Sequence, residues 1–169
     1  MLDSPRTEPA HLLAGGFHEL IGASPGDETI ALAFALSFAA RTPKNLCFCS
    51  AGGEAQERGD LYGHGLAALG IQPERMLMIT AAKEKDLLWT LEEAVASVAF
   101  GAVVGSLGST ERLYGFAASR RLKLRAAASR TPLFLLRHRS NGGAPNFGRI
   151  GGAALNDQTV WIHQFATKP

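Results

Sequence analysis

The turn after the first apolar segment of the chain has the outline of a phosphate-binding loop. Such a loop follows a strand with the pattern G-x-x-x-x-G-K-[ST]: backbone amides hold the phosphates, the lysine neutralises them and the hydroxyl binds magnesium. The residues that keep this outline are Gly22, Ser24, Gly26 and Thr29. No lysine is present, and Asp27 and Glu28 place negative charge where a triphosphate would lie. We therefore predict a degenerate loop that does not hold ATP well.

The acid that would hold the magnesium shell is also missing. It normally ends an apolar strand, yet Ala102–Val104 is followed by Gly105. A third group, the acid that orients the attacking water, falls within Ser50–Glu54, where glycine replaces it or Glu54 serves in a shifted register. These losses favour plain connections between strands and helices, so we predict no catalytic residue, no cofactor and no metal.

An atypical nucleotide-binding enzyme stays an alternative. It would use Thr29 on the metal and Glu54 as the base, with Lys44 or Arg41 supplying the missing cation from elsewhere. It predicts magnesium-dependent ATP turnover that falls sharply in Thr29→Ala.

A basic segment near the C-terminus is the second candidate site. The chain has a net charge of only +2, but nine of its 17 Lys and Arg residues lie between positions 111 and 150, with one acid, Glu111. Arginines, a Gly- and Asn-rich backbone and Phe147 could follow a single-stranded phosphate chain and stack on a base. The candidate nucleic-acid contacts are Arg120, Arg121, Arg125, Arg137, Arg139 and Arg149. A solvated helix face followed by a loop is the alternative.

Strands that alternate with helices must position these groups. The patterns predict strands at 17–21, 46–49, 76–80, 102–104, 133–136 and 159–163, and helices at 27–40, 65–69, 86–98 and 112–129. This order favours an α/β fold, a single domain whose mostly parallel sheet carries helices on both faces. We expect a loose leader at 1–16, a core domain at 17–165 and a Gly/Asn-rich loop near 139–152, within a less regular stretch from 137 to 152.

The remaining composition favours a cytoplasmic protein. Cys47 and Cys49 lie two apart on a predicted buried strand, which suggests structural thiols more than a metal site. No signal peptide is evident, and the longest apolar run, Ile30–Ala40, is shorter than the roughly 20 residues that cross a bilayer.

The order of these elements resembles the RecA core, and within it the chain is most similar to the ImuA family of bacterial SOS mutagenesis proteins. The likeness runs from about residue 17 to 140. The segments that carry it, besides the degenerate loop, are 61–75 (LYGHGLAALGIQPER), 88–94 (LWTLEEA), 102–105 (AVVG), 118–124 (ASRRLKL) and 133–137 (LFLLR).

The resemblance implies a non-catalytic accessory protein of damage-induced, error-prone translesion synthesis. Its implied partners are RecA and an ImuB-like translesion polymerase subunit, with single-stranded DNA as a further candidate. Arg137, Arg139 and Arg149 lie where RecA carries a DNA-binding loop. Only 21 residues precede Gly22, so we do not expect self-assembly into a RecA-type filament. A RecA-like domain with an unrelated regulatory partner stays open.

Overall fold

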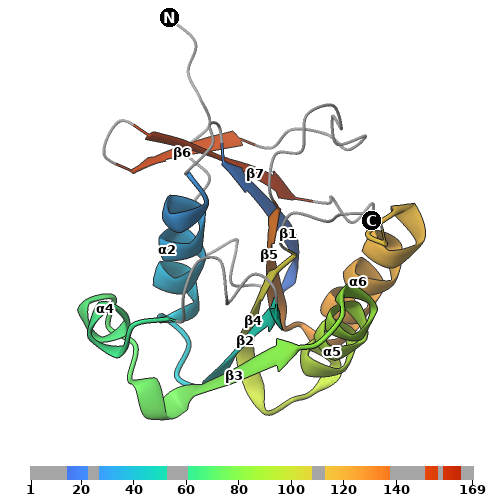
Figure 1. Ribbon diagram of the computed structural model, residues 1–169, viewed down its shortest axis with the longest axis horizontal. Coiled ribbons are helices and arrows are strands. Elements are labelled where there is room, and N and C mark those ends of the chain that lie inside the picture. The colour runs from blue at the N-terminus through green and yellow to red at the C-terminus, as the bar shows by residue number, and fades with distance from the viewer. Residues whose placement is uncertain are drawn as a thin grey trace, which may run out of the picture.

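A computed structural model describes residues 15–22, 27–52, 61–107, 113–137, 151–155 and 158–164. Figure 1 shows helices and strands that alternate along most of the chain. In chain order they are β1 (Gly16–Gly22), α2 (Glu28–Ala39), β2 (Asn45–Ala51), α4 (Gly63–Ala68), the 3-10 turn η1 (Pro73–Arg75), β3 (Met76–Ala81), α5 (Glu84–Ala96), β4 (Phe100–Ser106), α6 (Phe116–Ser129), β5 (Pro132–Arg137), β6 (Gly151–Leu155) and β7 (Gln158–Gln164).

One sheet joins all seven described strands, in the order β3-β2-β4-β5-β1-β7-β6. The first five strands of this order pair in parallel. Strand β7 pairs antiparallel with β1, and β6 pairs antiparallel with β7, so a hairpin extends the sheet beyond β1. The predicted α/β fold with a mostly parallel sheet is confirmed.

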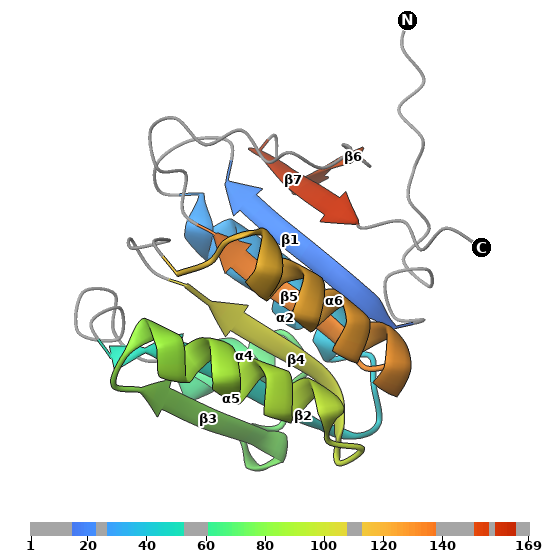
Figure 2. The same ribbon diagram turned by 90° about the vertical axis from the view of Figure 1, so that its right-hand side faces the viewer.

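The helices cover both faces of the sheet, as predicted. Helix α2 packs on one face against β1, β4 and β5, and α4 lies on the same side (Figures 1 and 2). Helices α5 and α6 lie side by side on the other face. All of these helices return the chain from the carboxyl ends of the parallel strands to their amino ends, which is the usual crossover of such sheets.

Two apolar cores follow from this layering. Side chains alternate along a strand, so Val104 packs with the α2 core while Val103 packs with the α5 and α6 core. Strand β5 is buried on both faces, which explains its unbroken apolar sequence. Full burial of a side chain such as Phe134 contributes about 1.5–3 kcal/mol.

Some predicted boundaries were wrong because tertiary contacts decide them. Helix α6 begins at Phe116, not 112, since its N-cap residue Gly115 is extended and Tyr114 is buried, with its hydroxyl bound to Glu19 of β1. Gly151 and Gly152 belong to β6 and not to a loop, because pairing with β7 satisfies a backbone whose glycines have little strand propensity of their own. Arg137 is the last residue of β5, and Gly16 begins β1.

Candidate functional site

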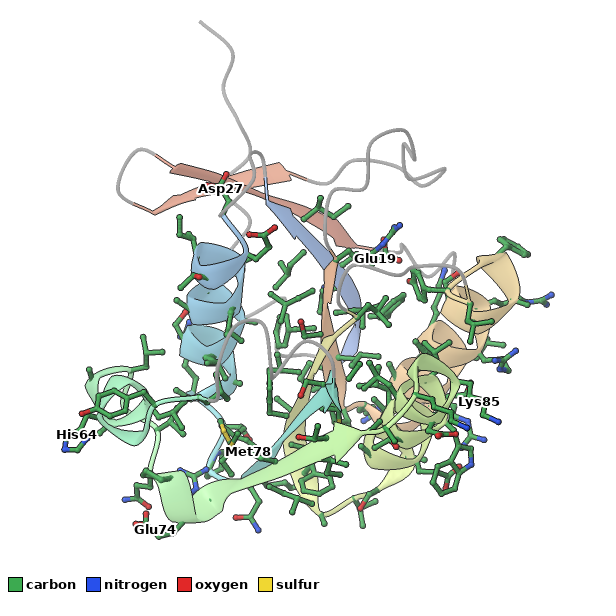
Figure 3. All side chains as sticks on the ribbon, in the orientation of Figure 1. Glu19, Asp27, His64, Glu74, Met78 and Lys85 are labelled. Carbon is green, nitrogen blue, oxygen red and sulfur yellow. The ribbon has the colours of Figure 1, made fainter. Side chains whose placement is uncertain are left out.

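The β1–α2 turn lies at the carboxyl edge of the parallel sheet, where ligands of such folds bind. Gly22 ends β1 and Thr29 is exposed in the first turn of α2. Figure 3 shows Asp27 at the start of this helix, and its carbonyl accepts the first helical hydrogen bond, from Ala31 N at 2.9 Å. The two acids at the helix start occupy the positive potential that an anion would use. Ser24 and Gly26 lie outside the described residues.

Arg41 and Lys44, the cations proposed for the enzyme alternative, lie at the amino ends of the parallel strands, opposite the β1–α2 turn. Arg41 follows α2, and Lys44 precedes β2, where its Nζ donates to the carbonyl of Val98 at 3.4 Å. The seven residues of β2, at about 3.3 Å each, place the two edges roughly 20 Å apart. Neither side chain reaches the β1–α2 turn of its own chain, so this part of the alternative was wrong. Glu54 lies outside the described residues.

Three hydroxyls mark the point where the chain direction within the sheet reverses. From β2 the chain continues outward to β3, whereas from β4 it continues the other way to β5, which makes the edge between β2 and β4 the switch point. The register places Ser50 beside both Thr80 and Ser106, and the two serines are buried. Neutral hydroxyls therefore stand at the level where a magnesium-binding carboxylate would be expected.

Packing against α5 leaves no room for a side chain at Gly105. A Cβ at this position would meet Leu91 Cδ2 at 2.7 Å and Leu135 Cδ1 at 3.1 Å, so α5 closes directly over it. The position also faces α5 and not α2, because it follows Val103 by two residues on the strand. The last residue of β4 on the α2 side is Ser106. Neither Gly105 nor Ser106 therefore supplies the magnesium-binding carboxylate.

A buried carboxylate on the α6 side of the sheet binds side chains from two distant parts of the chain. Glu19, on β1, is 1% exposed (Figure 3). Its Oε2 accepts from Arg137 Nη1 at 3.0 Å, and its Oε1 accepts from the hydroxyl of Tyr114. The Arg137 guanidinium also lies 5.1 Å from the centre of the Tyr114 ring. One carboxylate thus ties together β1, the end of β5 and the segment that enters α6.

This cluster changes the interpretation of Arg137, which was a candidate nucleic-acid contact. Its side chain is only 14% exposed and its charge is paired with Glu19. The sequence offered one signal, a glutamate inside an apolar alternating strand, which needs a partner when buried. Nothing in the sequence indicated the partners, since Tyr114 and Arg137 lie 95 and 118 residues away.

The basic helix α6 is bound to α5 by ion pairs. Arg121 Nε donates to Glu92 at 2.8 Å, and Arg125 lies 3.5 Å from Glu92 and 3.3 Å from Glu93. Arg120 is exposed, while Arg139 and Arg149 lie outside the described residues. Of the four candidate arginines that the structure describes, Arg121 and Arg125 pair with α5 and Arg137 pairs with Glu19. The contact of the six candidates with nucleic acid remains a prediction.

The cysteines lie on a buried strand, as predicted. Both thiols are free and buried, with the two Sγ atoms 3.5 Å apart. The hydrogen bond that the Cys49 thiol donates to Cys47, together with burial, raises the pKa of Cys49 above its ordinary range. Within the described ranges no three metal-ligating side chains come together, and no helix is long and apolar enough to cross a membrane.

Comparison with known proteins relates the chain to others both by sequence and by fold. No family model matches the chain. It is 31% identical over 140 residues to Protein ImuA from two strains of Caulobacter vibrioides, a stretch that covers 82% of this chain. The chain spans about half the length of these relatives, 53%. Among solved structures, SulA from Pseudomonas aeruginosa aligns with a TM-score of 0.54 and 22% identity, over 72% of this chain and 97% of that one, which supports the α/β fold.

Proposed function

We propose that this ImuA-like chain is a RecA-like accessory protein of damage-induced, error-prone DNA synthesis that acts by binding partners and not by hydrolysing ATP. The 140-residue similarity to ImuA carries the first half of the proposal. RecA and an ImuB-like polymerase subunit are the partners that this role calls for.

The carboxyl edge of the sheet supports the non-enzymatic half. Asp27 and Glu28 begin α2, hydroxyls replace the magnesium acid at the switch point, and Lys44 lies at the far edge. A triphosphate placed there would meet carboxylates at a distance where two like charges repel by kilocalories at intermediate dielectric. These features support a protein that does not hydrolyse ATP.

Single-stranded DNA is a secondary partner in this proposal. Arg137 is paired with Glu19, so direct contact rests on Arg139 and Arg149 of the predicted Gly/Asn-rich loop. Such contact would weaken steeply with salt, because each neutralised phosphate releases counterions.

The proposal is tested by the frequency of ultraviolet-induced mutation in the bacterium that encodes the chain. Deleting its gene should lower induced mutation while leaving spontaneous mutation unchanged, and a plasmid copy should restore it. Unchanged induced mutation in the deletion strain would remove the proposed role. Co-purification from irradiated cells then identifies whether RecA or the polymerase subunit is bound.

A further inference from the structure

The α5–α6 helix pair carries an exposed tryptophan on α5 and, on α6, an exposed arginine that Glu92 of α5 holds. Trp89 is 65% exposed, although a tryptophan is usually buried for most of its area. It precedes Glu92 by three residues and Glu93 by four, so it lies on the stripe of α5 that carries the ion pairs to α6. On α6 the exposed residue one turn before Arg121 is Ala117, which is too small to cover the indole.

Arg121 is positioned to bind a second carboxylate. Its guanidinium contacts Glu92 through Nε only, while its side chain remains 56% exposed. Holding the Nε edge fixes the plane of the group, and the Nη edge is left to donate two parallel hydrogen bonds, which suits a carboxylate. An arginine whose geometry is already fixed loses little side-chain entropy on binding.

Further exposed apolar and basic side chains continue the surface along both helices. Phe116 and Leu124 are exposed on α6 with Arg120 between them at helical spacing, and Lys85 lies one turn before Trp89 on the outer side of α5 (Figure 3). Exposed aromatic and arginine side chains of this kind form the energetic centres of protein interfaces. We call the surface of these residues, with Trp89 and Arg121, the α5–α6 face.

The charges of this face favour a protein over a nucleic acid. Glu93, which is half-exposed, lies on the same stripe of α5 as Trp89, and Glu92 lies next to it at the junction with α6. A phosphate chain crossing the face would pass these carboxylates, whereas a helix can place single acids opposite single cations.

We propose that the α5–α6 face binds an acidic amphipathic helix of a partner protein, with Trp89 covering its apolar stripe and Arg121 holding one of its carboxylates. The inference rests on the proposed function, which requires a protein partner, but it assigns the binding surface and the chemistry of the partner segment.

The test uses the full chain with Trp161→Phe, which leaves Trp89 as its sole tryptophan. The probe is a synthetic peptide of about 18 residues with a leucine stripe flanked by glutamates. Its matched control has lysines in place of the glutamates. Saturable binding should shift the Trp89 emission to shorter wavelength, and the lysine peptide should bind at least about tenfold more weakly. Equal binding of the two peptides, or no binding of either, overturns the proposal.

Variants locate the binding site by the anisotropy of labelled peptide. Trp89→Ala and Arg121→Lys should each weaken binding by about tenfold or more, while the exposed control Arg41→Met stays within about twofold. Arg121→Lys keeps a cation beside Glu92, so it tests the fork of donors without removing the ion pair. Unchanged affinity in both variants overturns the assignment, as does displacement of the peptide by an oligothymidylate of about 20 nucleotides, which would assign the face to nucleic acid. If the peptide does not bind, the result of the mutation-frequency experiment is unaffected. If the deletion strain shows unchanged induced mutation, peptide binding to the α5–α6 face is unaffected.

Discussion

Replacing Arg137 by methionine removes the cation from the buried cluster at β1 while keeping a side chain of similar length. Glu19 is then left as a carboxylate that is 1% exposed, with the Tyr114 hydroxyl as its remaining donor in the cluster. An uncompensated buried charge of this kind typically costs about 3–5 kcal/mol. Since the whole free energy of unfolding of a domain is about 5–15 kcal/mol, the loss is a large fraction of the total.

The large loss of unfolding free energy expected for Arg137→Met follows from the burial of Glu19. An exposed ion pair therefore provides the control. Arg125 is 42% exposed and pairs with Glu92 and Glu93 at 3.3–3.5 Å. Arg125→Met should cost only about 0–1 kcal/mol, because solvent screens such pairs. Tyr114→Phe, which removes one hydrogen bond to a charged acceptor, should fall between the two at about 1.5–3 kcal/mol.

Urea unfolding followed by circular dichroism measures these differences. With a slope of about 2 kcal/mol per molar, Arg137→Met should lower the midpoint by roughly 1.5–2.5 M. The double variant Glu19→Leu with Arg137→Met should recover much of this loss, because an apolar pair in the same space carries no desolvation cost. If Arg137→Met shifts the midpoint no further than Arg125→Met, the pair does not anchor the sheet and Arg137 returns to the candidate contacts for nucleic acid.

Three further predictions concern the edge of the sheet and the thiols. Gly105→Ala should lower the free energy of unfolding, measured in urea, by about 1–3 kcal/mol, because its Cβ would overlap Leu91. Gly105→Asp should bind no magnesium in a calorimetric titration, since its carboxylate would face α5. Raising the pH from 8 to 10 should lower the urea midpoint: Cys49 has a raised pKa in the folded chain, so it keeps a proton that the unfolded chain releases above about pH 8.5, and Cys49→Ala should reduce this slope. Thr29→Ala should leave ultraviolet-induced mutation at the level of the unaltered chain, whereas a fall to the level of the gene deletion would indicate nucleotide chemistry.

The sequence was informative where local pattern and burial agree. Unbroken apolar runs such as β5 predict strands covered on both faces, and the alternation of strands with helices predicts the parallel sheet. The acids at the start of α2 and the absence of a lysine are local features, so the altered charge of the β1–α2 turn is visible without coordinates.

The rest depends on pairs of residues that lie far apart in the chain. Glu19 finds its partners across three elements, and Arg121 finds Glu92 on a neighbouring helix 29 residues away. A count of basic residues cannot distinguish an arginine committed to an internal carboxylate from one available to a ligand. Similarly, the β6–β7 hairpin is determined by pairing at the sheet edge, which its glycines do not signal.

The most direct test of the central claim is a calorimetric titration of the purified chain with magnesium-ATP. We predict no saturable heat up to millimolar nucleotide, because carboxylates and hydroxyls occupy the positions of the lysine and the magnesium acid, and Lys44 and Arg41 lie at the other edge of the sheet. Saturable binding would contradict the account: it would require a cation from a neighbouring subunit, and the atypical enzyme would become the leading interpretation.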